Sequence, residues 1–300
     1  IIKKYEYFFK FIVLYDHIFS PNKLRDKLTS EMFEIHGYSK LGEKIEPQKA
    51  SVFMTTELLR NGQMIRKEVV VHPLGYPKLD RDYSDCTTEK LIIYAPTHLD
   101  NANRESWENF TSSNTHGSEI IRQLCSQFPQ YKIMYKPYIR EDSTIVAEIC
   151  AAGSEFDNFL FDQTSKNESL YKKAQLLVSD FSSTAFTFSI TTQRPVVFFS
   201  KNEGLLRNNS SDYLGERHKF GFVVHNCKEM VRAVEGILSG KQNHRQNILK
   251  AIKEKQHNYM TANEAIASAL IDIVTKQPLE KCEVYQRSWL IDGSRLWIES

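Results

Sequence analysis

Short apolar runs alternate with amphipathic stretches along most of the chain, a pattern typical of an α/β fold with parallel strands. In the second half, these runs predict buried strands at 90–94, 132–135, 175–179, 195–199 and 222–225. The periodicity of apolar positions predicts helices at 118–128, 168–174, 227–238 and 262–274. The second half of the chain is therefore expected to form one parallel sheet with helical crossovers.

The first ninety residues carry weaker signals. Strands are expected at 31–35, 51–55 and 68–72, with a short helix at 57–61. A segment dense in turn-forming residues, 73–77, is followed by the polar stretch 78–89, which indicates a boundary between lobes. We therefore expect three parts: an N-terminal lobe at 1–80, a C-terminal lobe at 81–278 and a tail at 279–300.

The segment 185–192 gives two conflicting signals. It is β-branched and aromatic, so residue propensity favours a strand. However, it lies between two strands that are expected to be parallel, and a parallel pair needs a crossover that is usually a helix. We let topology outweigh propensity and predict a buried helix.

Composition excludes several classes of protein. Apolar residues make up 41% and charged residues 25% of the chain, and the net charge is +2. A disordered chain would be less apolar, and a nucleic-acid-binding protein would be more basic, so no nucleic-acid partner is expected. The five cysteines form no Cys-x-x-Cys pair, which argues against a disulfide framework or structural zinc and favours reduced, cytosolic thiols.

Residues 1–19 are rich in apolar and aromatic side chains, but charged residues interrupt them. A membrane-spanning helix needs about 20 mostly apolar residues, and no small-residue cleavage site of a signal peptide follows. We expect a cytoplasmic protein whose N-terminal helix packs on a lobe. The alternative is attachment to the inner face of the cell membrane through Lys3, Lys4 and the aromatic side chains.

Four polar motifs follow predicted strands. In an open parallel sheet, ligands bind beyond the carboxyl ends of the strands, so these motifs are candidate site residues. They are His36-Gly37, Ala95-Pro96-Thr97, Lys136-Pro137 and the turn 179–184.

The turn 179–184 reads Ser179-Asp180-Phe181-Ser182-Ser183-Thr184. A hydroxyl of Ser182, Ser183 or Thr184 is expected to cap the following helix. The same helix start offers free N–H groups and a partial positive charge that suit a phosphate. Because capping alone needs no ligand, both interpretations stay open. Asp180 would repel a phosphate, so we expect it to order the loop or to orient an acceptor hydroxyl.

Two further residue types suit transfer chemistry. Lys136, helped by Arg140, could neutralise a diphosphate, or it could be a solvated surface lysine. The imidazole of His36 could take a proton from a hydroxyl near neutral pH, and Gly37 behind it would allow close backbone approach. A purely structural loop histidine is the alternative. The remaining histidines show no spacing suited to metal ligation, so no metal is expected.

Taken together, the motifs resemble those of the CDP-glycerol glycerophosphotransferase family, which builds teichoic-acid-like and capsular polymers. The resemblance covers roughly residues 30–275. It rests on Ile35-His36-Gly37, the segment 74–80, Tyr94-Ala95-Pro96-Thr97, Tyr135-Lys136-Pro137, the segment 177–184 and Arg194-Pro195 with the apolar run after it.

The resemblance implies a GT-B-like α/β fold of two Rossmann-like lobes with parallel sheets and the site between them. The first lobe is short for such a unit and the chain begins with Ile, so an incomplete N-terminal lobe is expected. The resemblance also implies that His36 is the base and that Lys136, Ser182 and Ser183 lie near the donor diphosphate, with Ser179, Thr184 and Thr97 in the same pocket.

Two positions depart from the family pattern. Tyr138, which is expected among the donor-binding residues, stands where the family usually has a histidine after Lys-Pro. A phenol replaces only part of the role of that histidine. His98 and Leu99 follow Thr97, where an aromatic residue and an arginine are usual.

Three functions follow from this reading. The first is transfer of a polyol phosphate from a CDP-activated donor to a hydroxyl of a glycan or polyol-phosphate acceptor, with no cofactor besides the donor substrate. The second is sugar transfer from a nucleotide sugar by the same architecture. The third is a non-catalytic, nucleotide-binding scaffold in surface-polymer assembly.

Overall fold

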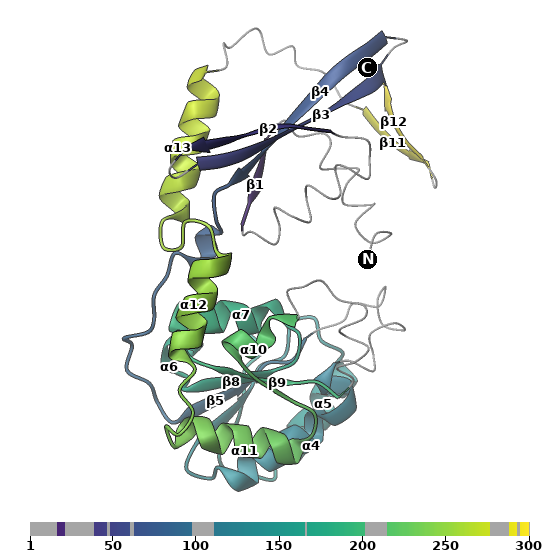
Figure 1. Cartoon of the computed structure of the whole chain (residues 1–300). Coiled ribbons are helices and arrows are strands. Elements are labelled where there is room, and N and C mark those ends of the chain that lie inside the picture. Colours follow the sequence, from purple (N-terminus) through teal and green to yellow (C-terminus); the bar gives the residue numbers. More distant parts are fainter. Residues whose placement is uncertain are drawn as a thin grey trace.

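The computed structural model describes residues 17–21, 39–46, 49–60, 63–97, 111–165, 167–201, 215–276, 288–292 and 295–299. These residues form two lobes, one above the other in Figure 1, each built around its own sheet. The predicted strand 31–35 lies outside the described residues, as does most of the predicted N-terminal helix. The last part of that segment, His17–Ser20, is a strand.

The first lobe contains a four-stranded sheet in the order β1-β4-β3-β2. Its strands are β1 (His17–Ser20), β2 (Ser39–Glu46), β3 (Lys49–Arg60) and β4 (Gln63–Pro73). Only β1 and β4 are parallel to each other, and β2, β3 and β4 form an antiparallel meander. The parallel arrangement expected from sequence is therefore confined, in this lobe, to one pair.

The helix predicted at 57–61 is wrong, because residues 57–60 belong to β3. Arg60 of β3 pairs with Gln63 of β4, so only two residues separate the strands. Those residues are Asn61 and Gly62, a dipeptide typical of two-residue hairpins. The pairing of β3 with β4 therefore outweighs the helix propensity of residues 57–60.

The second lobe contains a six-stranded, entirely parallel sheet in the order β10-β9-β8-β5-β6-β7. The strands are β5 (Leu91–Tyr94), β6 (Lys132–Tyr135), β7 (Phe159–Phe161), β8 (Leu176–Ser179), β9 (Val196–Phe199) and β10 (Gly221–Val224). Every residue of β5, β8 and β9 is buried, as expected for central strands with both faces covered. The parallel strands predicted from the apolar runs are confirmed, and β7 is an additional edge strand.

Helices cover both faces of this sheet. One core contains residues of α4 (Ser112–Gln127), α5 (Ser143–Gly153) and α11 (Cys227–Leu238). The other contains residues of α6 (Glu168–Lys173), α7 (Ser183–Thr192), α10 (Arg217–Phe220) and α12 (Arg245–Lys255). The lobe is thus a three-layer α/β unit that places the carboxyl ends of its strands along one edge.

The helical assignment of 185–192 is confirmed by α7. Ser182 caps the helix, and the side chains of Phe186, Phe188 and Ile190 are buried in the core. Gln193 ends it in the left-handed region with a φ of 54°. Burial against a parallel sheet therefore overrides the strand propensity of this segment.

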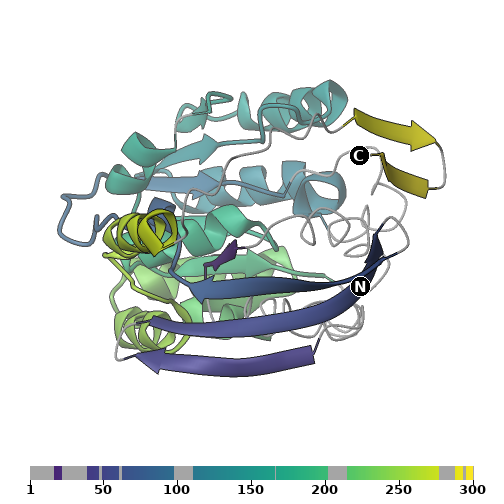
Figure 2. The same cartoon turned by 90° about the horizontal axis from the view of Figure 1, so that it is seen from above.

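Two chain connections meet between the lobes. The connection from β4 to β5 includes the short 3-10 helix η1 (Pro77–Leu79), and Asp80 follows it. The Asp80 carboxylate accepts hydrogen bonds from the backbone amides of Ala262 at 3.0 Å and Asn263 at 2.6 Å, at the start of α13 (Ala262–Lys276). Figure 1 and Figure 2 show α13 beside one end of the first sheet. The predicted lobe boundary near residue 80 falls in this connection.

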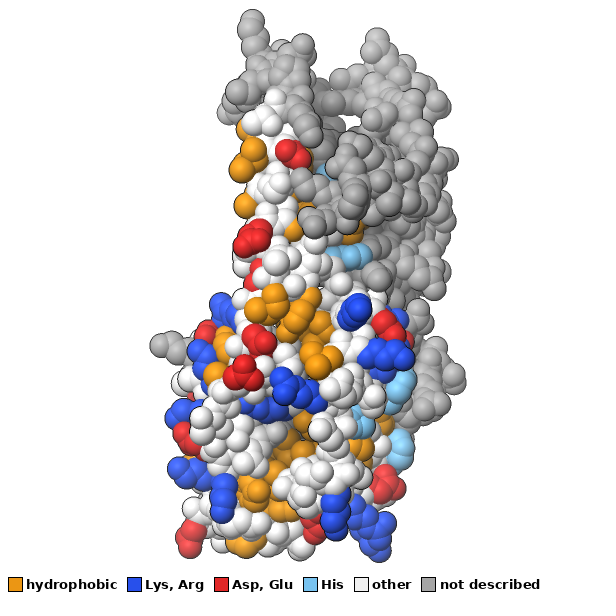
Figure 3. Space-filling view, turned by 60° about the vertical axis from the view of Figure 1, so that its left-hand side comes forward, with side chains coloured by type: hydrophobic (Ala, Val, Ile, Leu, Met, Phe, Trp, Pro, Cys, Tyr) orange, Lys and Arg blue, Asp and Glu red, His pale blue; other side chains and the backbone are white. Residues whose placement is uncertain are grey.

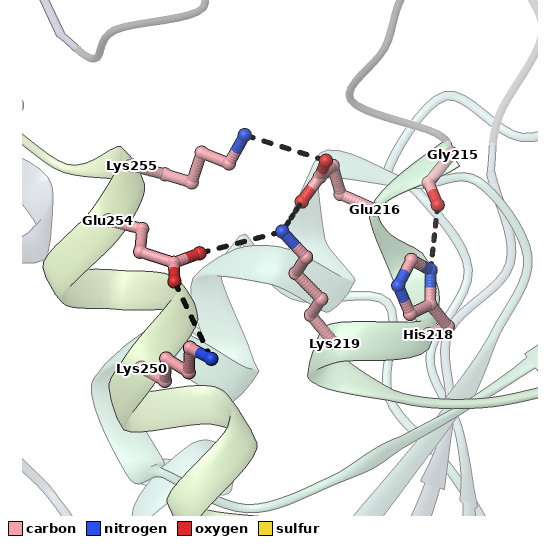
Figure 4. A network of polar contacts seen from close by, with 7 residues as sticks. All are labelled: Gly215, Glu216, His218, Lys219, Lys250, Glu254 and Lys255. Atoms are coloured by element: carbon pink, nitrogen blue, oxygen red, sulfur yellow. Dashed lines mark hydrogen bonds and ion pairs between the residues drawn. The ribbon is translucent and has the colours of Figure 1, made fainter.

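An ion-pair network fastens α10 to α12 (Figure 4). Lys219 Nζ lies 2.6 Å from a carboxylate oxygen of Glu216 and 3.6 Å from one of Glu254. Lys255 Nζ lies 3.5 Å from the other oxygen of Glu216. Because these side chains are partly exposed, each pair contributes little to stability alone.

None of the described helices combines the length and apolar character that crossing a membrane requires. Apolar side chains are nevertheless exposed on α13, notably those of Leu270, Ile271 and Val274. Figure 3 shows apolar surface on the side of the molecule that carries this helix. The C-terminal residues 288–292 and 295–299 form the antiparallel hairpin of β11 (Ser288–Asp292) and β12 (Arg295–Glu299).

Candidate active site

The candidate site lies where β5, β6 and β8 end side by side. The strand order places β5 between β8 and β6, so their carboxyl ends are neighbours. The Ser179 hydroxyl donates to the carbonyl oxygen of Ala95 at 2.6 Å, and the amide of Lys136 donates to the carbonyl oxygen of Tyr94 at 2.8 Å. The structure therefore brings together the motifs at Thr97, Lys136 and 179–184, which are far apart in sequence.

Asp180 organises this edge. Its side chain is fully buried. One carboxylate oxygen accepts from the amide and hydroxyl of Thr97 and from the amide of Phe181. The other accepts from the amide and the hydroxyl of Ser112, each at 2.9 Å. These five bonds fit the expected role in ordering the loop.

The second role considered for Asp180, direct contact with an acceptor hydroxyl, needs an open approach to the carboxylate. Burial closes that approach, and protein donors occupy both oxygens. The Ser179 hydroxyl is also buried and donates to the protein, and its contact with the donor stays a prediction. Thr97 likewise uses its hydroxyl on Asp180.

The start of α7 combines capping with exposure. Ser182 caps the helix, because its Oγ accepts from the amide of Thr184 at 3.2 Å. Ser183 is exposed, and Ser182 and Thr184 are half-buried. Ser182 therefore acts as the helix cap, as the capping interpretation expects. The first turn of α7 is nevertheless exposed, so the positive end of the helix dipole faces solvent. A phosphate at this helix start stays a prediction.

Lys136 is not the solvated surface lysine considered as an alternative. Its side chain is only 5% exposed, and Nζ lies 3.3 Å from a carboxylate oxygen of Asp162. Nζ also donates to the carbonyl oxygen of Thr164 at 2.6 Å. Burial opposes ionisation of Asp162, but hydrogen bonds from Thr164 and the charge of Lys136 outweigh it and lower the carboxyl pKa. The cation is thus held at the strand end by a carboxylate.

Tyr138 and Arg140 lie on the exposed turn that follows Lys136. Their predicted contact with the donor stays a prediction. His36 and Gly37 lie outside the described residues, so the assignment of His36 as the base also stays a prediction. Among the side chains that the structure describes, no group of three or more His, Cys, Asp or Glu residues is arranged to hold a metal ion.

A cavity of about 670 Å³ adjoins the start of α7, and the sequence motifs gave only a partial indication of it. Ser183 and Thr184 line it, together with three cationic side chains that we did not single out from sequence: Lys78, Arg81 and Lys172. Lys78 belongs to the 74–80 motif, so its position in that motif was the available signal. Arg81 and Lys172 carry no comparable sequence signal.

The model of the CDP-glycerol:poly(glycerophosphate) glycerophosphotransferase family matches residues 66–269. The chain belongs to this family. The match includes the whole parallel sheet, the start of α7 and the connection that precedes them. The fold and the family expected from the motifs are therefore confirmed.

Solved structures show the same architecture. A structure of the wall teichoic acid polymerase TagF matches with a TM-score of 0.51 and 15% identity, over 91% of this chain and 61% of that one. A variant of TagF soaked with CDPG matches with a TM-score of 0.54 and 17% identity, over 89% of this chain and 60% of that one. The chain thus spans about 60% of the length of these polymerases. No curated protein sequence is significantly similar to it.

Proposed function

We propose that the chain transfers a polyol phosphate of the glycerol-phosphate type from a CDP-activated donor to a hydroxyl of a cell-surface polymer or glycan. The family match over residues 66–269 is the observation that carries this proposal. The TagF structures add support for the fold, and one of them was soaked with CDPG. The donor is a substrate, and the proposal needs no separate cofactor or metal.

In the proposed reaction, an acceptor oxygen attacks the β-phosphorus of the donor. The bond between that phosphorus and the bridging oxygen breaks, CMP leaves, and the acceptor proton passes to His36. The helix start at Ser182 and Ser183 would stabilise the diphosphate charge, and catalysis would come mainly from positioning and charge neutralisation. The buried Asp180 would act indirectly, by holding together the ends of β5 and β8 and the start of α4.

The Lys136–Asp162 pair limits how Lys136 could contribute. A lysine already paired with a carboxylate adds less positive charge to a diphosphate than a free one does. We therefore propose that Lys136 fixes the turn carrying Tyr138 and Arg140, and that the α7 start carries more of the phosphate interaction. We also propose that the chain is cytoplasmic and associates peripherally with the inner face of the cell membrane.

The proposal is tested by comparing two helix caps. Ser182→Ala removes the cap of α7, and Asn226→Ala removes the equivalent cap of α11, where the Asn226 side chain accepts from the amide of Glu229 at 2.9 Å. Each should cost roughly 1 kcal/mol of stability. Only Ser182→Ala should weaken CDP-glycerol binding in a titration and raise the KM for this donor.

Four results would count against parts of the proposal. Equal donor affinity in both cap variants would remove the α7 start from the donor site. Thermal stabilisation by a UDP-sugar but not by CDP-glycerol would favour sugar transfer instead. Donor binding without release of CMP would indicate the non-catalytic scaffold, and normal CMP release in His36→Ala would refute His36 as the base.

A further inference from the structure

The cavity beside α7 is a groove, which we call the α6–α7 groove. One wall is a single face of α7 that carries Ser183, Thr184, Thr187 and Thr191. These residues span about 12 Å along the helix axis. The hydroxyls of Thr187 and Thr191 donate to backbone carbonyl oxygens one turn earlier in the helix. Residues of α6 and the preceding turn form the opposite wall, and Lys78, Arg81 and Tyr83 of the connection between the lobes complete the groove. It therefore runs from the proposed donor end of α7 along the outside of the lobe.

The charge of the groove is positive. Lys78, Arg81 and Lys172 line it together with one carboxylate, that of Glu168, which leaves a formal net charge of +2. Lys78 is exposed and forms no ion pair with any residue in the described part of the chain. Such a lining attracts an anion of more than one charge.

The other two cations share Glu168. Arg81 Nη1 lies 2.6 Å from one carboxylate oxygen and Lys172 Nζ lies 3.0 Å from the other. All three side chains are between 41% and 49% exposed, so these pairs are weak and can rearrange around an incoming anion. Arg81 and Lys172 can thus exchange the carboxylate for phosphate oxygens at little cost.

The lining does not suit a nucleotide base. The two aromatic residues of the groove, Tyr83 and Tyr171, are 7% and 5% exposed, and the Lys172 ammonium lies 4.8 Å above the Tyr83 ring. Neither ring offers a free face for stacking. Separated cations beside the exposed start of α7 instead suit a ligand that carries phosphates at intervals along a chain.

We propose that the α6–α7 groove binds the phosphodiester-linked polyol chain of the acceptor, with the growing end directed toward Ser183 and Thr184. This inference rests on the proposed function for its choice of ligand, but its binding test does not depend on turnover. It assigns Lys78, Arg81 and Lys172 to recognition of acceptor phosphates, separate from the donor diphosphate at the helix start.

The test measures binding of a fluorescent oligo(glycerol phosphate) to the full chain by anisotropy. The double variant Lys78→Gln/Lys172→Gln should weaken binding about five-fold, the size expected for two exposed charge contacts. Glu168→Gln removes the one carboxylate among the described residues of the groove and should tighten binding. The affinity of the wild-type chain for the oligomer should fall steeply with salt. Inorganic phosphate and glycerol, as separate probes, should bind far more weakly than the oligomer.

Lys173→Gln is the matched control, because Lys173 is an exposed lysine on the same helix that pairs with Glu89 and does not line the groove. Unchanged oligomer affinity in the double variant, or an equal loss in Lys173→Gln, would overturn the proposal. An equal loss of CDP-glycerol affinity in the double variant would also overturn it, by assigning the groove to the donor. Thermal melting of each variant establishes that it is folded.

The outcome separates the two proposals. If the groove variants lose oligomer binding while the wild-type chain releases no CMP from CDP-glycerol, the groove stands and the proposed reaction fails. If the wild-type chain turns over CDP-glycerol and the groove variants bind oligomer normally, the reaction stands and the groove assignment fails.

Discussion

The carboxylate of Asp180 accepts hydrogen bonds from both the backbone amide and the hydroxyl of Ser112, each at 2.9 Å. Ser112 begins α4, which packs on the opposite face of the sheet from α7, and the amide of Ser112 has no acceptor within the helix. Asp180, which directly follows β8, supplies that acceptor. The Ser112 hydroxyl also lies 3.0 Å from the hydroxyl of Tyr94, the last residue of β5. A single carboxylate thereby joins two strand ends and one helix start.

Asp180→Asn should destabilise the fold strongly. An amide group cannot accept at both positions, so at least one set of donors loses its partner in a fully buried site. The expected loss is about 2–4 kcal/mol in the free energy of unfolding, measured by urea denaturation. Asp85→Asn, at an exposed position, is the control and should change stability little. Equal stabilities of the two variants would contradict the organising role of Asp180.

Gly75→Ala should be far more damaging than Gly240→Ala. Both glycines have positive φ, 88° and 71°, so an alanine is strained at either position. At Gly75 a Cβ would also overlap the carbonyl oxygen of His257, whereas the space around Gly240 is open. We expect about 1 kcal/mol for Gly240→Ala and clearly more for Gly75→Ala, measured as shifts in thermal melting. Similar shifts would show that the contact of Gly75 with His257 is unimportant.

The Lys136–Asp162 pair should make stability depend on acid pH. The pKa of Asp162 in the folded chain is lower than its ordinary value of 3.8, so its stabilising contribution is present above that value. It is lost as the pH falls through the lowered pKa. Asp162→Asn should therefore be less stable than the wild-type chain at neutral pH, and the two stabilities should converge below pH 3.8. Parallel curves down to the lowest pH would exclude this pair as the cause.

Arg194→Met should loosen the packing of α6 and of the connection between the lobes. One guanidinium nitrogen donates to three carbonyl oxygens at the end of α6, those of Tyr171, Lys172 and Ala174. A second nitrogen, Nη2, donates to the carbonyl oxygens of Tyr83 and Cys86. Burial lowers the arginine pKa, so the cation depends on these acceptors. We expect a loss of about 3 kcal/mol by chemical denaturation.

Arg122→Gln is the comparison for that prediction. Arg122 forms an exposed ion pair with Glu155, and its loss should cost less than about 1 kcal/mol. If both arginine variants were equally stable, the carbonyl contacts of Arg194 would not contribute as described.

The parallel sheet was predictable because its strands are buried on both faces and read as continuous apolar runs. The helix α7 was predictable only by topology, since its aromatic and β-branched residues favour a strand locally. The first lobe was harder, because its parallel pair joins β1 to β4 across about fifty residues of sequence, and the local signals of its antiparallel strands are weak. Residues 57–60 are good helix formers that nevertheless extend β3, and the short strands β1 and β7 carry too few residues to give a period.

The candidate site was predictable in place but not in detail. The rule that ligands bind at strand ends located Thr97, Lys136 and Ser182 on one edge. Sequence could not show that Asp162, 26 residues after Lys136, pairs with that lysine. It also could not show that Ser179 and Thr97 use their hydroxyls within the protein, because those partners are set by the order of the strands in the sheet.

The hydrogen bonds of Asp80 to the start of α13 have a mechanical consequence. The chain passes between the lobes once after β4 and again at α13, and Asp80 ties the two passages together while Asn258 donates to the carbonyl oxygen of Pro73 at 3.1 Å. Because the two connections between the lobes are joined at one place, they would act as one hinge and not as two independent linkers. Opening of the lobes would then be a rotation about this junction, and the residues farthest from the junction would move the most.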